Sequence, residues 1–173
     1  MSIKNTAGYW IEQLEMIQHP EGGYFKETFR ADEKTAAGQL PDRYSTDRSI
    51  STSIYFLLTT ESVSNFHRLN SDEIWHFHTG GAARIHIISP EGVYGYKDIG
   101  TSLEDGQQLQ VIIPRNSWFA AEVISEDYIL VGCTVAPGFE FEDFELAERT
   151  QLSKEHPQLS SLIERFTTET SQA

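Results

Sequence analysis

The feature that most constrains the fold of this chain is a series of about nine short strand-like segments with no helical segment among them. The segments are rich in β-branched and aromatic residues, which suit the pleated surface of a sheet, and turn-forming residues separate nearly every pair. Strands in direct succession predict an antiparallel sandwich or barrel, because a βαβ sheet places helices between its strands. The predicted strands are residues 24–30, 50–59, 63–68, 73–78, 83–89, 93–97, 109–113, 118–123 and 128–135.

The two ends of the chain show helical spacing instead. Apolar residues at helix spacing predict a helix over residues 6–17, with Asn5 or Thr6 as its cap, and short helices over about 143–166. A chain of 173 residues is long enough for one domain with a full core, so we expect a single domain over residues 1–173 with its barrel at about 20–137. Residues 31–48 form a long polar loop, a kind of segment that is often functional.

Charge and cysteine content restrict the partners and the compartment. The net charge of −13 argues against nucleic acid and against anionic membrane surfaces, because both need a positive face. The single cysteine, Cys133, lies in an apolar run and cannot form an internal disulfide. The sequence has no signal-peptide pattern at its start and no apolar run near the roughly 20 residues of a membrane helix. We therefore expect a soluble cytoplasmic protein.

Residues 66–80 hold the densest group of chemically active side chains, with three histidines, two acids and a tryptophan. The run reads as a strand, a polar turn and a second strand, and this pattern predicts a hairpin that brings His67 and Glu73 together. A histidine held beside a carboxylate can transfer a proton or bind a metal.

Strand periodicity divides this group between two faces. Residues two apart on a strand share a face, so Glu73 and Trp75 are expected to point into the barrel while His76 and His78 point away. A bulge near Trp75 would turn His76 inward. The resulting interior, aromatic with a few polar groups, is typical of a small-molecule pocket.

The order of these residues resembles the cupin superfamily, whose first motif places two histidines, a glutamate and a glycine on two strands of a jelly-roll barrel. His67 takes the first histidine position, Glu73 the glutamate and Gly80 the closing glycine, whereas Leu69 stands in place of the second histidine. The resemblance implies a double-stranded β-helix with short terminal helices.

The second cupin motif resembles residues 106–123, where Pro114 takes the proline position. Phe119 stands where metal-binding cupins have their third histidine, so only His67 and Glu73 remain of the usual four ligands. A tight metal site usually needs three or more protein ligands. We therefore predict no cofactor and no metal, and if a metal does bind, a ligand set of His67, Glu73 and His76.

Four runs lie in this order along almost the whole chain: HPEGGYFKETFR, STSIYFLL, FHRLNSDEIWHFHTG and VGCTVAPGFEFEDFELA. They resemble an uncharacterised cupin subfamily that is called sugar-epimerase-like, and this resemblance implies a homodimer.

Three functions stay open at this point. The first is a metal-independent sugar epimerase or isomerase in which His67 and Glu73 form the catalytic pair. The others are a metal-dependent cupin enzyme with a rearranged ligand set, and a non-catalytic protein that binds a small molecule such as a sugar derivative. The residues expected to contact the ligand are Tyr55, Trp75, His76, Trp118 and Arg30.

Overall fold

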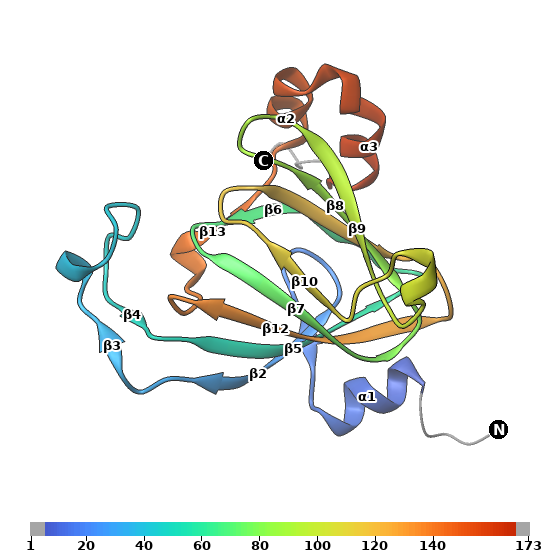
Figure 1. The fold of residues 1–173 in the computed structure, drawn as a ribbon, viewed down its shortest axis with the longest axis horizontal. Coiled ribbons are helices and arrows are strands. Elements are labelled where there is room, and N and C mark those ends of the chain that lie inside the picture. Colours follow the sequence, from blue (N-terminus) through green and yellow to red (C-terminus); the bar gives the residue numbers. More distant parts are fainter. Residues whose placement is uncertain (1–5, 169–173) are drawn as a thin grey trace.

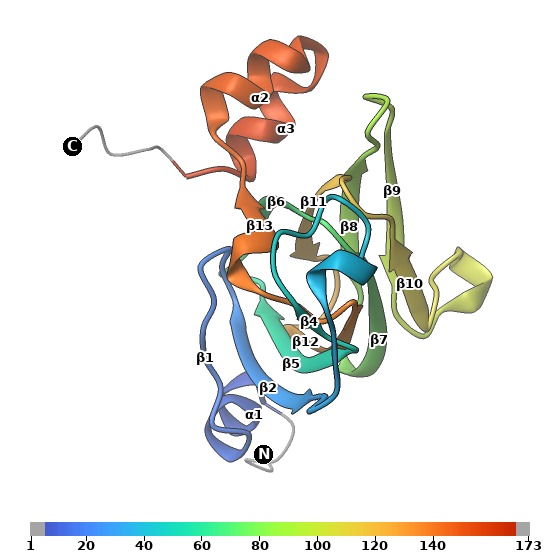
Figure 2. The same ribbon diagram turned by 90° about the vertical axis from the view of Figure 1, so that its left-hand side faces the viewer.

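The protein folds into two antiparallel sheets that face each other and enclose an apolar interior, as predicted. The structure, a computed structural model, describes residues 6–168. In that range a six-stranded sheet has the order β1-β2-β5-β12-β7-β10, and a five-stranded sheet has the order β13-β6-β11-β8-β9. Figures 1 and 2 show the two sheets as the walls of a barrel. A small third sheet pairs β3 with β4.

The strands follow the predicted segments closely. The six-stranded sheet contains β1 (Ile17–Gln18), β2 (Tyr24–Arg30), β5 (Thr52–Thr59), β7 (Asp72–Gly80), β10 (Gln110–Ile113) and β12 (Tyr128–Ala136). The five-stranded sheet contains β6 (Ser64–Leu69), β8 (Ala83–Ile88), β9 (Tyr94–Ile99), β11 (Trp118–Val123) and β13 (Phe144–Leu146). The small sheet contains β3 (Lys34–Thr35) and β4 (Arg48–Ser49), with a 3-10 turn, η1 (Ala37–Gln39), between them.

The predicted hairpin between His67 and Glu73 is wrong. Strand β6 ends at Leu69 in the five-stranded sheet, and β7 begins at Asp72 in the six-stranded sheet. The chain crosses between the sheets at this point, so the two side chains face the interior from opposite walls instead of pairing across a turn. His67 pairs with Phe119 of β11 instead.

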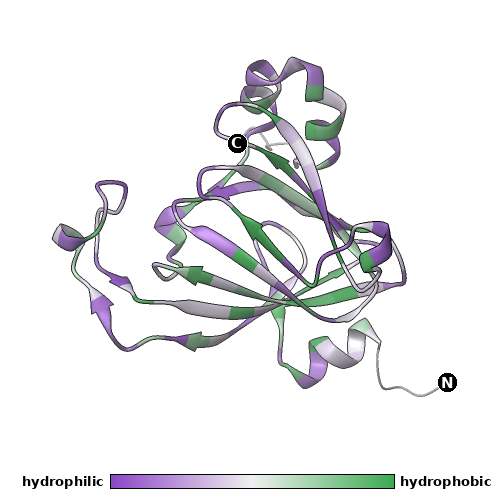
Figure 3. Cartoon of the chain, viewed as in Figure 1, coloured by the Kyte–Doolittle hydropathy of each residue, from purple (hydrophilic) through white to green (hydrophobic). Residues whose placement is uncertain are grey.

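Alternating strand residues fill the interior. The main core brings together buried side chains from both sheets, and Figure 3 shows hydrophobic stretches along the barrel strands. Burying apolar side chains of this size contributes about 1.5–3 kcal/mol each to folding. The largest members of this core include Phe56, Trp75, Ile85, Ile113 and Phe119.

The N-terminal helix is shorter than predicted. Helix α1 covers Ala7–Gln13, and the side chain of Thr6 caps it by accepting a hydrogen bond from the Tyr9 amide at 3.2 Å. Glu15 adopts a positive φ of 51°, which ends the helical path before β1 begins. Asn5, the alternative cap, lies outside the described residues. The helix packs on the outer face of the six-stranded sheet in a cluster with Tyr55.

The C-terminal segment is only partly helical. Residues 144–146, predicted to be helical, form β13 and pair with β6, while the helices α2 (Arg149–Glu155) and α3 (Ser160–Arg165) follow. These helices cover the outer face of the five-stranded sheet through a second apolar cluster that includes Trp118 and Phe166. The remaining one-turn elements are η2 (Leu103–Asp105), η3 (Phe141–Asp143) and η4 (Pro157–Leu159). Over residues 6–168, no helix has the length and apolar character required to cross a lipid bilayer.

Candidate active site

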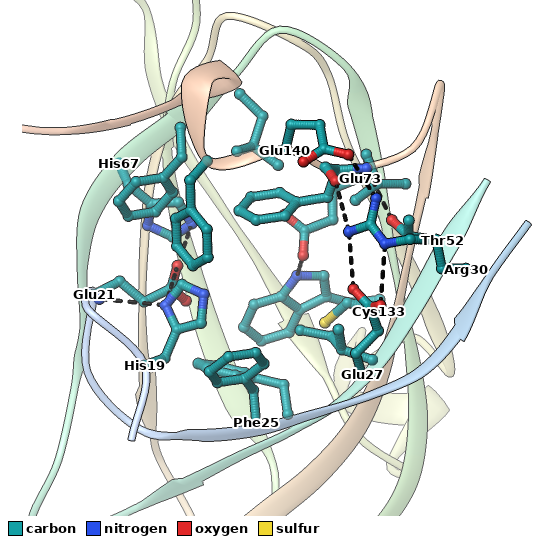
Figure 4. Close-up of a pocket in the computed structure, with 18 residues that line it drawn as sticks. His19, Glu21, Phe25, Glu27, Arg30, Thr52, His67, Glu73, Cys133 and Glu140 are labelled. Atoms are coloured by element: carbon teal, nitrogen blue, oxygen red, sulfur yellow. Dashed lines mark hydrogen bonds and ion pairs between the residues drawn. The ribbon is translucent and has the colours of Figure 1, made fainter. Parts of the chain in front are cut away.

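A cavity with aromatic walls lies between the two sheets and opens at one end of the barrel. It encloses about 700 Å³ including its open mouth, and Figure 4 shows polar groups on two sides of it with the Glu73 carboxyl group between them. His67 and Glu21 lie on one side, and Arg30 lies with its carboxylate partners at the other. The aromatic side chains that line the cavity are Phe25, Phe56, Trp75, Phe139, Phe141 and Phe144.

His67 forms a buried ion pair with Glu21. Its Nδ1 atom lies 2.7 Å from the carbonyl oxygen of Asn65, and because a carbonyl only accepts, Nδ1 carries a proton. Its Nε2 atom lies 3.0 Å from Oε2 of Glu21. Burial disfavours the imidazolium, but the Glu21 carboxylate outweighs burial and raises the pKa of His67. The pair is therefore an imidazolium with a carboxylate, and both ring nitrogens are committed.

Glu21 is held in place by the loop between β1 and β2. Its backbone oxygen accepts hydrogen bonds from the Asn65 amide at 2.8 Å and from the Asn65 side chain at 2.9 Å. The hydroxyl of Ser64 donates to its carboxylate at 2.8 Å. The next residue, Gly22, has a φ of 111°, and a Cβ atom there would lie 2.0 Å from the Val63 oxygen. Only glycine allows the loop to approach β6 this closely.

Burial and the neighbouring His67 and Ser64 side chains have opposite effects on the pKa of Glu21. Burial opposes its ionised form, while the charge of His67, together with hydrogen bonds from His67 and Ser64, lowers the pKa of Glu21 overall. Glu21 was not among the predicted site residues. It lies in a turn, where strand periodicity gives no information. Its run HPEGG belongs to the family resemblance, which assigns no role to this glutamate.

His19 stands beside this pair as a neutral acceptor. Its Nδ1 atom accepts a hydrogen bond from the Glu21 amide at 3.3 Å and lies 3.4 Å from Oε2 of Glu21. Burial lowers the pKa of His19; the Glu21 charge partly offsets this effect and the His67 charge adds to it. The ring packs edge-on against Phe25 at 4.7 Å between centroids, so it also forms part of the aromatic wall.

Glu73 is a buried carboxyl group on the opposite wall. Its Oε1 atom accepts a hydrogen bond from the indole Nε1 of Trp75 at 3.1 Å, and 8% of the residue is exposed. Burial and the negative charge of Glu21 raise the pKa of Glu73 to about 7, although His67, Cys133 and Trp75 favour the ionised form. Glu73 therefore exchanges its proton in the neutral range, where a general acid or base is most effective.

Arg30 lies at the mouth of the cavity, where two carboxylates hold it. Its Nε and Nη2 atoms donate to the two carboxylate oxygens of Glu27 at 3.1 and 2.9 Å. Nη1 donates to Glu140 at 2.7 Å, and Nη2 also donates to the backbone oxygen of Phe139 at 3.0 Å. Hydrogen bonding and the charge of Glu27, with Glu140 adding to them, raise the pKa of Arg30 against a smaller effect of burial.

The cavity brings together four of the predicted site residues, namely His67, Glu73, Trp75 and Arg30. The expected partnership of His67 with Glu73 is replaced by the ion pair of His67 with Glu21. Glu73 and His67 still influence each other through their charges across the cavity.

Three predicted ligand-binding residues lie elsewhere. Tyr55 faces outward and packs edge-on against His78, with ring centroids 5.6 Å apart, beneath α1. Trp118 belongs to the cluster under the C-terminal helices, where Arg68 lies 4.3 Å above its ring. These positions follow from the parity of the strands, because both residues alternate with side chains that point into the barrel.

His76 also points away from the cavity. Its Nε2 atom lies 3.1 Å from the Thr134 hydroxyl, and Gln110 donates to its Nδ1 atom at 3.0 Å. The register shift between β7 and β12 falls between Phe77 and Thr79, too late in the strand to turn His76 inward.

The alternative metal ligand set of His67, Glu73 and His76 is therefore not assembled. His76 lies on the far face of the sheet, and both nitrogens of His67 are already bonded to protein oxygens. Over residues 6–168, no three or more His, Cys, Asp or Glu side chains are grouped so that they could hold a metal ion. These donors do not fit a protein-bound metal of the usual kind.

Two packed antiparallel sheets around a ligand-sized cavity define a small jelly-roll barrel protein with an internal pocket. The family model described as cupin superfamily (DUF985) matches residues 8–147, and the chain belongs to this family.

Relatives of known structure share this fold along nearly their whole length. A crystal structure of a protein from Shewanella oneidensis is 35% identical with a TM-score of 0.86, and the match covers 95% of this chain and 98% of that one. A hypothetical protein from Leishmania major is also 35% identical, with a TM-score of 0.87 and coverage of 95% and 100%.

One further sequence relative and one structural match are informative. An uncharacterized protein of Saccharomyces cerevisiae is 32% identical over 143 residues, which are 77% of this chain and 71% of the yeast protein. Oxalate decarboxylase from Bacillus subtilis is 14% identical with a TM-score of 0.53, and the match covers 88% of this chain and 37% of that enzyme. At this identity the likeness concerns the fold alone.

Proposed function

We propose that this protein is a metal-independent isomerase, related in chemistry to the sugar epimerases, that moves a proton next to the carbonyl group of a small polar substrate such as a sugar derivative. The observation that carries the proposal is the buried carboxyl group of Glu73, which lies in an aromatic cavity and changes charge near neutral pH. Perturbed acids in a cavity of this kind are typical of catalytic sites.

In this proposal Glu73 is the group that takes and returns the proton. Its carboxylate removes a proton from the carbon beside the carbonyl group, and the electron pair of that C–H bond moves to the carbonyl oxygen as an enolate. Glu73 then protonates the former carbonyl carbon, and the hydroxyl proton on the carbon that lost its hydrogen moves to the enolate oxygen, so the carbonyl group shifts by one carbon and no further reactant is consumed. While the enolate is bound, the proton on Glu73 exchanges with water, so deuterium from D2O enters the substrate. Because both nitrogens of His67 are committed, the imidazolium stabilises the negative charge of the enolate instead of moving a proton.

The expected roles of the two residues are thus revised. The sequence suggests His67 as the base and Glu73 as its orienting partner, whereas the geometry supports Glu73 as the base and Glu21 as the partner of His67. A single base also favours transfer between neighbouring carbons over epimerisation, which usually requires groups on both faces of one carbon.

The proposal is tested by hydrogen exchange in D2O. The protein is incubated with a panel of aldoses, ketoses and other α-hydroxycarbonyl compounds, and proton NMR follows the loss of the signal from the carbon next to the carbonyl group. We expect exchange on at least one compound, and Glu73→Gln should abolish it. The matched control is Glu145→Gln, because Glu145 pairs with Arg68 outside the cavity. Exchange that survives Glu73→Gln would refute the role of Glu73.

A ligand-binding protein without catalysis is the second candidate. The ion pairs of Arg30 with Glu140 and of His67 with Glu21 favour it, because a cavity whose polar groups are already bonded binds with little reorganisation. Compounds that raise the melting temperature yet show no exchange in D2O and no chemical change would establish this candidate over the isomerase.

A further inference from the structure

The mouth of the cavity carries an excess of negative charge. Glu27 and Glu140 both line it and both bond to the single guanidinium of Arg30, so one carboxylate charge is left uncompensated there. Deeper in the cavity, His67 offsets the charge of Glu21 and adds nothing to the balance. The chain as a whole has a net charge of −13, and this wider field also attracts cations and repels anions.

Arg30 is poorly placed to bind an anion. A guanidinium has five N–H groups, and Arg30 donates four hydrogen bonds, two to Glu27, one to Glu140 and one to the Phe139 carbonyl oxygen. A phosphate or carboxylate that accepted from the remaining N–H of Nη1 would lie beside the Glu140 carboxylate, which accepts from the same nitrogen, and a two-point contact would require it to displace one of the partners. This arrangement opposes anionic ligands even though an arginine lines the cavity.

Aromatic side chains line the same cavity as these carboxylates. Phe139 and Phe141 flank Glu140 in the sequence, and their ring centroids are 5.1 Å apart in an edge-on contact. Phe144 lies 6.1 Å from Phe141 and continues the aromatic surface into the cavity. Ring faces attract an ammonium group through their quadrupole, and a nearby carboxylate adds a charged acceptor.

From this combination we infer that the ligand of the cavity carries a protonated amine, which lies at the mouth between Glu140 and the rings of Phe139 and Phe141. The ligand class is a small polar compound with a primary amino group, of which an amino sugar is one example, and compounds with phosphate or carboxylate groups are excluded. The inference rests on the proposed function, since it names the substrate class of the same cavity.

The test uses the indole N–H signals of the three tryptophans as reporters. Trp75 lines the cavity. Trp10 belongs to α1, which packs on the outer face of the six-stranded sheet, and Trp118 lies beneath the C-terminal helices. Ligands in the cavity should therefore shift the Trp75 signal and leave the other two unchanged. The ¹⁵N-labelled protein is titrated with compounds that share one body and differ in charge. The first series is the amine glucosamine, the neutral sugar glucose and the carboxylate glucuronate. The second is benzylamine, benzyl alcohol and benzoate, in the same order of charge.

We expect the amine of at least one series to shift the Trp75 signal more strongly than its neutral counterpart, and the carboxylates to leave that signal unchanged. Glu140→Gln should raise the dissociation constant of the amine by about threefold to tenfold. Glu145→Gln, the matched variant outside the cavity, should leave it unchanged. A carboxylate that shifts Trp75 as strongly as the amine would overturn the inference. The inference would also be overturned if the amines left the Trp75 signal unchanged, or if they bound the Glu140→Gln variant as tightly as the unmodified protein.

These outcomes are distinguishable from failure of the proposed function. Selective amine binding without hydrogen exchange would leave the inference in place and remove the isomerase. Hydrogen exchange that depends on Glu73 but occurs only on neutral or anionic compounds would support the isomerase and remove the inference of an amine ligand.

Discussion

The Nε2 atom of His67 lies 3.0 Å from the Oε2 atom of Glu21, so the buried histidine takes its partner from the turn before β2 and not from the strand that follows it. This pairing leaves Glu73 without a salt bridge on the opposite wall, where burial favours its neutral form. Glu21 and Glu73, the two buried acids of the cavity, thus differ in charge below neutral pH, and such a difference commonly separates catalytic roles.

Removing the charge of Glu21 should destabilise the fold. Glu21→Gln leaves the buried imidazolium of His67 without its counter-charge, so we expect a loss of about 3 kcal/mol in the free energy of unfolding. Urea unfolding at pH 6 measures it. The exposed pair of Arg68 and Glu145 provides the control, because Glu145→Gln should cost less than about 1 kcal/mol. Equal losses in the two variants would contradict a buried ion pair.

The stability of the protein should also depend on the proton of Glu73. Its pKa is raised in the folded state to about 7, so the folded protein holds a proton that the unfolded chain releases near its ordinary pKa of 4.5. The contribution of this proton to stability is complete below pH 4.5 and is lost as the pH rises through 7. Relative to Glu73→Gln, the unmodified protein should lose stability over this range by an amount on the order of 3 kcal/mol.

Urea unfolding of both proteins between pH 4 and pH 8 checks this prediction. Parallel stability curves for the two proteins would show that Glu73 titrates normally.

The indole of Trp75 should tune the acidity of Glu73. Its N–H donates to the carboxylate and favours the ionised form, so Trp75→Phe should raise the pKa of Glu73 further. A ¹³C NMR titration of the glutamate side chains follows the change directly. Trp118→Phe alters a tryptophan of the other apolar cluster and should leave the Glu73 titration where it was.

Arg48 should be essential to the loop that precedes β5. Its guanidinium is fully buried and donates to both oxygens of Asp143, at 2.7 and 2.8 Å. Arg48→Ala leaves the buried Asp143 carboxylate without its charged partner, with the Asn70 amide still donating to it at 3.0 Å, and we expect a loss of about 3–5 kcal/mol in unfolding free energy. Thermal and urea denaturation test this against Arg68→Ala at the surface, where the loss should stay below about 1 kcal/mol.

Most of the barrel could be predicted from the sequence because its strands alternate and its turns carry strong turn residues. Sheet membership could not, since alternation shows which residues share a face but not which strand lies beside which. For this reason the strand-like segments 63–68 and 73–78 predict a hairpin, although β6 and β7 belong to different sheets. The spacing of Phe144 and Leu146 is compatible with a strand as well as with a helix. Pairing with β6 makes this segment a strand.

The candidate site was predictable only where it lies on regular strands. Strand parity separates Glu73 and Trp75 from His76 correctly, but it carries no information about Glu21, which reaches the cavity from a turn. The expected cytoplasmic location and the expected homodimer remain predictions. Fractionation and light scattering would test them.

The cavity is assembled from distant parts of the chain. Glu21 comes from the first turn, while Phe141 and Phe144 follow the last long strand. During synthesis on a ribosome, the first strands emerge well before these aromatic residues do. A nascent chain therefore cannot close this cavity until its last long strand and the aromatic residues after it have left the exit tunnel, so nothing that the cavity binds can guide the early stages of folding.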